Sequence, residues 1–183
     1  MIFLLMLLII LLIFLCIVLV TMTLSVYGWL ITSAPFVPVK NHALKYIIDA
    51  LELQDTSVLC DLGSGEGKVL LAALESNPHV HVRGYEIGPV PRMLSLFRLR
   101  KYRHRSKIYN RDLFKAELSD VTHIFLYLYP SVLQKLEPIF DSQLHQGVRV
   151  VTCDFTFPNK KPISVIDMPH QGKLAKKLYV YIW

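Results

Sequence analysis

The chain has 183 residues, 53% of them hydrophobic, and a formal net charge of +6. These averages combine two unlike regions, because no Asp, Glu, Lys or Arg occurs between Met1 and Val39. The charged remainder is long enough for one domain of ordinary size and too short for two. The three cysteines are too few for a disulfide framework, and they form no Cys-x-x-Cys pair. We therefore predict neither a disulfide nor a metal site, and we expect Cys60 and Cys153 to be core residues.

The N-terminal region is an uninterrupted apolar run. Residues 2–20 are Ile, Phe, Leu, Met, Cys and Val only, and apolar character continues to about Ile31. A membrane-spanning helix needs roughly 20 apolar residues. A cleaved signal peptide is the alternative, but it would carry a basic segment before the run and a better cleavage site than Thr32-Ser33-Ala34-Pro35. We therefore predict an uncleaved transmembrane anchor over residues 1–31.

The residues after this anchor predict its orientation and the start of the domain. Pro35 and Pro38 indicate a stiff proline-rich linker over residues 32–40, which leaves 41–183 as the compact domain. Lys40 and Lys45 follow the apolar run, and no basic side chain precedes it. The positive-inside rule then predicts a single-pass membrane protein with its domain on the cytoplasmic side.

Helical and strand patterns alternate along the domain. By apolar spacing and by Gly and Pro positions, helices are expected at 42–53, 68–75, 89–103 and 132–144. Strands are expected at 57–62, 80–86, 107–110, 122–129, 148–155, 163–167 and 177–183. The last two strands follow each other without a clear helix between them. This order predicts an α/β fold, a Rossmann-like doubly wound seven-stranded sheet with a terminal antiparallel strand pair.

A glycine-rich loop follows the first expected strand, in the segment Asp61-Leu62-Gly63-Ser64-Gly65-Glu66-Gly67. Glycines allow a tight turn and close approach of a ligand to the backbone, but alone they are a weak signal. The carboxylates of Asp61 and Glu66 would repel the pyrophosphate of a dinucleotide, and the G-x-G-x-G spacing differs from G-x-G-x-x-G. No Walker lysine stands in a G-K-[ST] context. NAD and ATP are therefore disfavoured.

S-adenosyl-L-methionine fits this loop better, because it has no phosphate and carries a sulfonium and an ammonium group. A carboxylate beside these cations is favourable, and Asp61 is placed for that role. The alternative is a tight turn that binds nothing, with Asp61 as a helix cap. We predict S-adenosyl-L-methionine as the cofactor, with Gly63, Ser64, Gly65 and Gly67 forming the loop around it.

Two further acidic residues follow the next two strands. Glu86 ends the second strand, where a carboxylate can accept hydrogen bonds from ribose hydroxyls. Asp112 follows the third strand and is a candidate partner of the adenine amino group, although a turn cap is an equal alternative. Ile87 and Leu113 are candidate apolar walls for the adenine ring.

Together these motifs resemble those of class I, seven-stranded S-adenosylmethionine-dependent methyltransferases. Asp61 to Gly67, Gly84-Tyr85-Glu86 and Arg111-Asp112-Leu113 carry the likeness. Within that superfamily the apolar N-terminus, Pro35-Phe36-Val37-Pro38 and the segment 149–158 are most similar to membrane-tethered protein-lysine methyltransferases, which modify the ATP synthase c-subunit or the adenine nucleotide translocase. The resemblance implies that the chain methylates lysine side chains of a membrane-associated protein, with the linker closing over the cofactor.

The substrate end of the expected site lies after the fourth strand, at Tyr127-Leu128-Tyr129-Pro130. Tyr127 and Tyr129 could shape an aromatic channel for an ammonium group by cation–π contact. The alternative is that both tyrosines simply pack within the sheet. Tyr129 and Tyr127 are the candidate catalytic residues of the chain.

A basic stretch, residues 98–107, holds six Lys or Arg in ten residues. A nucleic-acid surface would use such a stretch, but an anchor in the same chain makes anionic lipid headgroups the simpler partner. An ordinary solvated helix face is equally compatible. Two other functions stay open beside lysine methylation: methylation of a small or lipid-like molecule at the bilayer, and a non-catalytic cofactor-binding interaction module.

Overall fold

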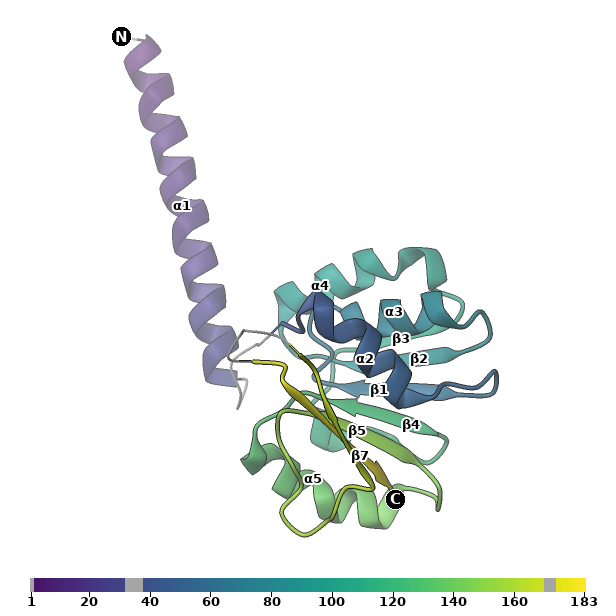
Figure 1. The fold of residues 1–183 in the computed structure, drawn as a ribbon. Coiled ribbons are helices and arrows are strands. Elements are labelled where there is room, and N and C mark those ends of the chain that lie inside the picture. Colours follow the sequence, from purple (N-terminus) through teal and green to yellow (C-terminus); the bar gives the residue numbers. More distant parts are fainter. Residues whose placement is uncertain (1, 32–37, 170–173) are drawn as a thin grey trace. The chain divides into compact units, whose positions relative to one another are not determined.

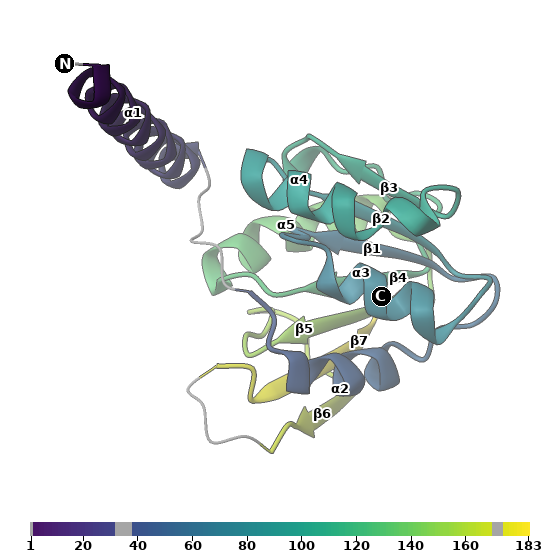
Figure 2. The same ribbon diagram turned by 90° about the horizontal axis from the view of Figure 1, so that it is seen from above.

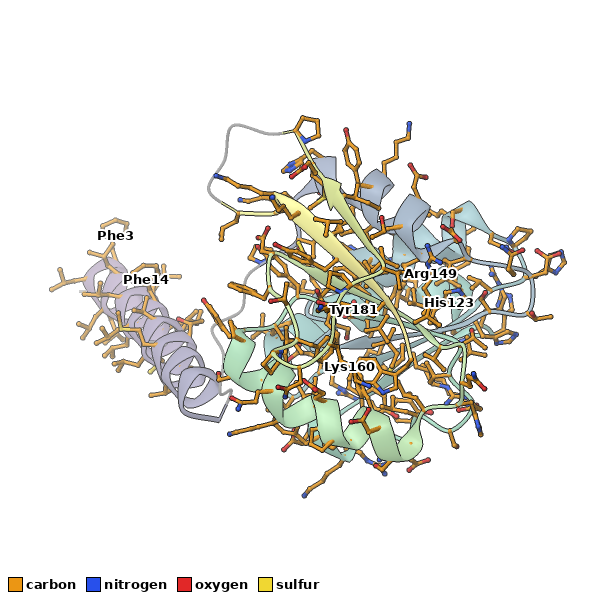
Figure 3. The ribbon with its side chains drawn as sticks, turned by 60° about the horizontal axis from the view of Figure 1, so that its bottom comes forward. Phe3, Phe14, His123, Arg149, Lys160 and Tyr181 are labelled. Carbon is orange, nitrogen blue, oxygen red and sulfur yellow. The ribbon has the colours of Figure 1, made fainter. Side chains whose placement is uncertain are left out.

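The computed structural model describes residues 2–31, 38–169 and 174–183. The chain divides into two compact units, Met1–Pro35 and Phe36–Trp183. The first unit is the single helix α1, Ile2–Ile31 (Figure 1). Its segment Phe3–Thr23 is long and apolar enough to cross a membrane and buries none of its side chains against protein, although a signal sequence has the same properties. Phe3 and Phe14 illustrate this exposure, since both side chains project from the helix (Figure 3).

The second unit is built on a seven-stranded sheet with the order β3-β2-β1-β4-β5-β7-β6 (Figure 1). The strands are β1 Val58–Leu62, β2 His81–Tyr85, β3 Ser106–Tyr109, β4 His123–Leu126, β5 Arg149–Cys153, β6 Ser164–Asp167 and β7 Lys177–Ile182. The first five pair in parallel, and β7 pairs antiparallel with both β5 and β6. The predicted seven-stranded fold with a terminal antiparallel pair is confirmed.

Alternation of side chains along the strands creates two cores. In β1, Leu59 joins the core under α2 (Asn41–Leu51) and α3 (Lys68–Ser76), whereas Cys60 and Leu62 join the core under α5 (Pro130–Gln143). Both faces are thus covered, which explains why the parallel strands are nearly continuous apolar runs. Viewed from above, α2 and α3 lie on one side of the sheet and α5 on the other, with α4 (Pro89–Arg98) beside β2 and β3 (Figure 2).

Aromatic side chains complete the second core, because no helix separates β5 from β6 in the described segment 154–163. Phe157 contacts Tyr181 edge-on at a ring-centroid distance of 5.2 Å, and Trp183 contacts Phe140 in the same way at 5.3 Å. The C-terminal Trp183 is also held by Lys160, whose ammonium lies 4.2 Å from its ring centroid. Figure 3 shows Lys160 and Tyr181 on this side of the domain.

Two element boundaries differ from the sequence prediction. Strand β4 ends at Leu126, so Tyr127 and Tyr129 lie beyond the strand and not within it. Pro130 lies in the first turn of α5 and restricts Tyr129 to extended backbone, so residues 127–129 form the connection from β4 to α5. Helix α4 also ends earlier than predicted, at Arg98, and a short 3₁₀ turn η1, Arg100–Tyr102, follows it.

Candidate functional site

The glycine loop lies at the carboxyl end of β1, where the chain order of the sheet reverses between β1 and β4. This is the position where open α/β sheets bind ligands. Gly63, Gly65 and Gly67 all have left-handed backbone, with φ of +81°, +53° and +75°. Residues with a Cβ rarely adopt this conformation, so the loop requires glycine at these three positions.

The loop is fixed to the neighbouring strand β2. The carbonyl of Tyr85 accepts hydrogen bonds from the N–H groups of Gly63 and Ser64 at 2.9 and 3.1 Å. The loop packs closely against β2: a Cβ at Gly84 would lie 2.5 Å from the Ser64 hydroxyl oxygen. Gly84, which the sequence analysis noted only as part of a motif, therefore provides the space for the loop.

Glu86 bridges the loop and the start of α4. Its Oε2 accepts from the Gly65 N–H at 2.9 Å, and its Oε1 accepts from the Gly88 N–H at 2.6 Å. A carboxylate has about four lone-pair sites, so these two bonds leave acceptor capacity for a ligand. The structure places Glu86 beside the loop, as predicted, and its contact with a ribose stays a prediction.

Asp61 is the electrostatic centre of the site. Only 4% of the residue is exposed, and no donor among the described residues bonds its carboxylate. Burial, and secondarily the nearby Glu86 carboxylate, raise the pKa of Asp61 to about 8. A buried carboxylate without a cationic partner is costly, so this position favours a ligand that brings a positive charge.

Two other loop side chains behave differently from Asp61. The Ser64 hydroxyl is buried and has no hydrogen-bond partner among the described residues, so it too is available to a ligand. Glu66 instead forms ion pairs with Lys68 at 3.0 Å and Arg98 at 2.9 Å. Burial raises the pKa of Glu66, but these two cations outweigh burial and hold it below its usual value. Glu66 thus ties the loop to α4 and is not free to repel a pyrophosphate, as the sequence had suggested. Asp61 and Glu86 are the carboxylates that would repel one.

The candidate adenine residues lie at the next strand ends. Ile87 and Leu113 are half-buried, which suits an apolar wall. Asp112 is exposed, and its carboxylate accepts from the Phe114 N–H at 3.0 Å, capping the short 3₁₀ helix η2, Leu113–Lys115. The capping role is therefore present in the structure, and an adenine contact of Asp112 stays a prediction.

The two candidate tyrosines have distinct surroundings. The Tyr127 hydroxyl donates to Asp154 Oδ2 at 2.9 Å, and burial together with this bond raises the pKa of Tyr127. Tyr129 is 37% exposed and its ring centroid lies 5.5 Å from that of Phe155. Tyr127 is thus engaged in the fold, whereas Tyr129 and Phe155 form an aromatic pair that a substrate can reach.

Asp154 lies next to Tyr127 at the candidate site, and no sequence pattern singled it out. Its backbone is left-handed, with φ of +61°, and its carboxylate accepts from Tyr127 and from the N–H groups of Ala175 and Lys176 at 2.6 and 2.7 Å. It therefore joins the end of β5 to the start of β7. Its partners lie more than 20 residues away in either direction, and no local pattern in the sequence links them.

The linker that was expected to close over the cofactor, Ala34–Pro38, lies mostly outside the described residues. Its described continuation reaches the loop, because the Lys68 ammonium donates to the Val39 carbonyl at 3.4 Å. Cys60 and Cys153 are buried, as expected of core residues. Among residues 2–31, 38–169 and 174–183, no cluster of three or more His, Cys, Asp or Glu could hold a metal ion.

Comparison with known proteins gives consistent matches. Residues 61–164 match the ANTKMT methyltransferase domain family. The chain is 33% identical to the adenine nucleotide translocase lysine N-methyltransferase of Mus musculus over 72% of its length, and 29% identical to the ATP synthase c-subunit lysine N-methyltransferase of Xenopus laevis over 70%. These matches span only 58% and 56% of the two relatives.

One solved structure aligns with a larger share of the chain than these two relatives do. The crystal structure of an RNA methyltransferase from Salinibacter ruber, in complex with S-adenosyl-L-homocysteine, superposes with a TM-score of 0.73. It is 30% identical and covers 80% of this chain and 93% of its own.

Proposed function

Because the chain belongs to the ANTKMT methyltransferase domain family, we propose that it is an S-adenosyl-L-methionine-dependent methyltransferase that acts on protein lysine side chains. The relatives named as lysine N-methyltransferases support the acceptor class, and the neighbour solved with S-adenosyl-L-homocysteine supports the cofactor. The cofactor would supply a methyl group already activated by its sulfonium.

The observation that carries this proposal is the buried Asp61 carboxylate beside a loop of three left-handed glycines. A cationic cofactor fits this site, because its positive charge would stabilise the ionised form of Asp61 that burial disfavours. Asp61 would hold the amino-acid end of the cofactor, and Glu86 would accept from the ribose. Gly63 and Gly65 allow the backbone to approach the ligand closely.

At the acceptor end, the Tyr129–Phe155 pair would guide the lysine. Methyl transfer mainly requires alignment of nucleophile and methyl group, which can be worth about 7–11 kcal/mol. The lysine must also lose its proton, from a reference pKa of about 10.4. Desolvation between two aromatic rings favours the neutral amine, and the rings can attract the ammonium before it loses its proton. Tyr129 therefore has a positioning role in this proposal.

We also propose that α1 anchors the chain in a membrane, with the domain on the cytoplasmic side and a membrane-associated protein as substrate. The apolar segment Phe3–Thr23 and the lysines that follow it support this arrangement. RNA is a second candidate acceptor, because the Salinibacter ruber neighbour is described as an RNA methyltransferase. A lipid-like acceptor would also suit an anchored enzyme.

The deciding experiment is transfer of labelled methyl groups from S-adenosyl-L-methionine to a membrane extract by the purified full chain. Label in protein that yields methyl-lysine on hydrolysis supports the proposal. Label in the RNA or lipid fraction would replace the lysine acceptor by one of the alternatives. The Asp61→Ala variant should lose cofactor binding, and Asp49→Ala, an exposed change on α2, should retain it. Unchanged affinity of Asp61→Ala would contradict the assigned cofactor site.

A further inference from the structure

Helix α4 carries its apolar face outward. Val90, Met93, Leu94 and Phe97 follow i, i+3, i+4, i+7 spacing and therefore form one stripe along the helix. On a helix that covers a sheet, such a stripe normally faces the core. Here the four side chains are between 45% and 65% exposed, and Ser95 is the buried residue of the helix. A contiguous apolar stripe in water marks a surface that contacts something else.

The reason for this orientation lies in the glycine loop. A Cβ at Gly67 would lie 2.4 Å from the Ser95 hydroxyl oxygen, so α4 approaches the start of α3 closely. Only a small side chain fits at that contact, and Ser95 occupies it. The large apolar residues of α4 are therefore left on the opposite side of the helix.

The segment that carries the exposed stripe is rich in positive charge. From Ile87 to Arg111, both included, there are eight Lys or Arg and no Asp or Glu. Some of these cations serve the fold: Arg98 pairs with Glu66, and Arg105 donates to the carbonyls of Asn77 and Val80. Three others, Arg100, Lys101 and Arg103, are exposed and form no ion pair within the described residues. Lys107 is also exposed, but it precedes Ile108 on β3 and therefore points to the other face of the sheet.

Apolar and basic side chains also meet in a groove of about 480 Å³ between α3 and the α4–η1 segment. The groove is lined by Leu71, Leu94 and Phe97 on its apolar side and by Arg98, Arg100, Lys101, Tyr102 and Glu75 elsewhere. The Arg100 guanidinium lies 3.9 Å from the centroid of the Phe97 ring, so cation and apolar stripe are directly adjacent.

We propose that this surface, the α4 face, docks the domain on an anionic lipid bilayer. The α4 face consists of Val90, Met93, Leu94 and Phe97 with the exposed cations Arg100 and Lys101, which line the groove, and Arg103, which follows η1. The apolar stripe enters the headgroup–acyl boundary, and the cations bind anionic headgroups, as in helices that lie in the membrane interface. Charge complementarity selects an anionic bilayer over a neutral apolar partner. The proposal does not depend on which molecule accepts the methyl group.

The apolar helix in the same chain makes such docking effective. A tether to the bilayer raises the local concentration of lipid at the domain, so a short helix with four apolar side chains is sufficient. Docking would give the domain a fixed orientation toward the membrane.

The test reconstitutes the full chain into vesicles and reports on the environment of α4. A polarity-sensitive fluorophore is attached at Met93→Cys, in a chain whose exposed Cys16 is changed to Ala; Cys60 and Cys153 are buried. The matched control carries the fluorophore at Ser142→Cys, an exposed position on α5, across the sheet from α4. Vesicles are either pure phosphatidylcholine or equal parts phosphatidylcholine and phosphatidylserine.

Docking predicts that the Met93→Cys probe shifts to shorter wavelength and is quenched by spin-labelled lipid in the anionic vesicles, several-fold more than the Ser142→Cys probe. Arg100→Gln with Lys101→Gln should lower the docked-to-undocked ratio on the order of tenfold. The charge-matched pair Lys135→Gln and Lys161→Gln, exposed elsewhere on the domain, should leave it unchanged. Equal quenching at both probe sites would overturn the proposal. So would a shift that depends on protein density and not on anionic lipid, since it would identify a second copy as the occupant.

Discussion

At the residue scale, the candidate site is dominated by two neighbouring carboxylates in a buried position. Glu86 satisfies its charge with two backbone N–H groups, whereas Asp61 has no such donor among the described residues. The domain without ligand therefore holds Asp61 with a raised pKa, near 8. Ionisation of Asp61 is therefore unfavourable in the free domain, and a bound cation next to the carboxylate would make it favourable.

A pH dependence of stability follows for Asp61. Its pKa rises from 3.8 to about 8 on folding, so between these values the folded state binds more protons than the unfolded state. The free energy of unfolding of the ligand-free protein should therefore fall as pH rises from 4 to 8, by up to a few kcal/mol. Asp61→Asn should remove this slope, and Asp49→Asn should not. Denaturant unfolding of the domain at several pH values measures both, and an unchanged slope in Asp61→Asn would refute the assignment.

His123 should produce the opposite slope. It lies at the far end of β4 from the glycine loop, opposite Arg149 of β5 (Figure 3). Burial, and next the Arg149 charge, lower the pKa of His123 from 6.5 to about 4. In the Asp61→Asn background, stability should thus fall as pH drops from 6.5 to 4, by about 1–2 kcal/mol after allowance for solvent screening. Replacing His123 by Gln should flatten this part of the curve; a persistent slope would assign it to other groups.

At the element scale, the contact between the glycine loop and α4 links cofactor binding to the fold. Gly67→Ala combines a left-handed φ of +75° with a Cβ 2.4 Å from the Ser95 oxygen. We expect it to destabilise the domain by about 2–3 kcal/mol. The buried Ser95 hydroxyl has no hydrogen-bond partner among the described residues, so Ser95→Ala alone should be close to neutral.

The double variant separates the two causes. Removing the Ser95 oxygen leaves its Cβ 3.2 Å from the added methyl group, so Gly67→Ala with Ser95→Ala should recover part of the loss while the backbone strain remains. Thermal unfolding of the four proteins gives the coupling energy, which we expect at about 0.5–1.5 kcal/mol. Strict additivity would mean that the close contact is unimportant.

The elements themselves were largely predictable from the sequence. Strands and glycine turns are local signals, and each of the seven strands lies close to its expected position. The end of β4 differs most, because the pattern Ile124 to Tyr129 stays apolar although Pro130 already starts α5. The exposure of the apolar face of α4 could not be predicted either, because helical periodicity identifies an apolar stripe but does not show whether the stripe faces the core or the solvent.

The residues of the candidate site also differ in whether a local pattern or only the folded sheet brings them together. Asp61, Glu86 and the glycines stand at strand ends, and strand ends of a parallel sheet meet at one edge, so the local pattern predicts that these residues lie together. Their contact with a cofactor stays a prediction. Asp154 and the Tyr129–Phe155 pair depend on which strands become neighbours, and that is a property of the sheet order. The ion pair of Glu66 with Arg98 joins residues that are 32 positions apart, so the sequence pattern does not show that this carboxylate is neutralised within the fold.

At the scale of the whole molecule, the chain joins an apolar helix to a domain with its own two cores. The helix buries none of the segment Phe3–Thr23 against protein, which is compatible with a membrane anchor and with a signal peptide. These two fates predict different products. An anchor leaves the full-length mass and a protein that stays with membranes, whereas cleavage shortens the chain and releases the domain.

The anchor predicts that the full chain remains in the membrane pellet after alkaline carbonate extraction, with an intact N-terminus by mass spectrometry. Changing Leu8, Leu11 and Leu15 to Arg should move it to the supernatant, because each Arg near the centre of a spanning helix costs about 2.5–3.5 kcal/mol. The same three positions changed to Ala should stay in the pellet. A shortened mature chain would show instead that residues 1–31 are a signal peptide.

A reporter fused after Trp183 tests on which side of the membrane the domain lies. Reporter activity on the cytoplasmic side fits the lysines at positions 40 and 45, and activity on the opposite side would overturn the predicted orientation.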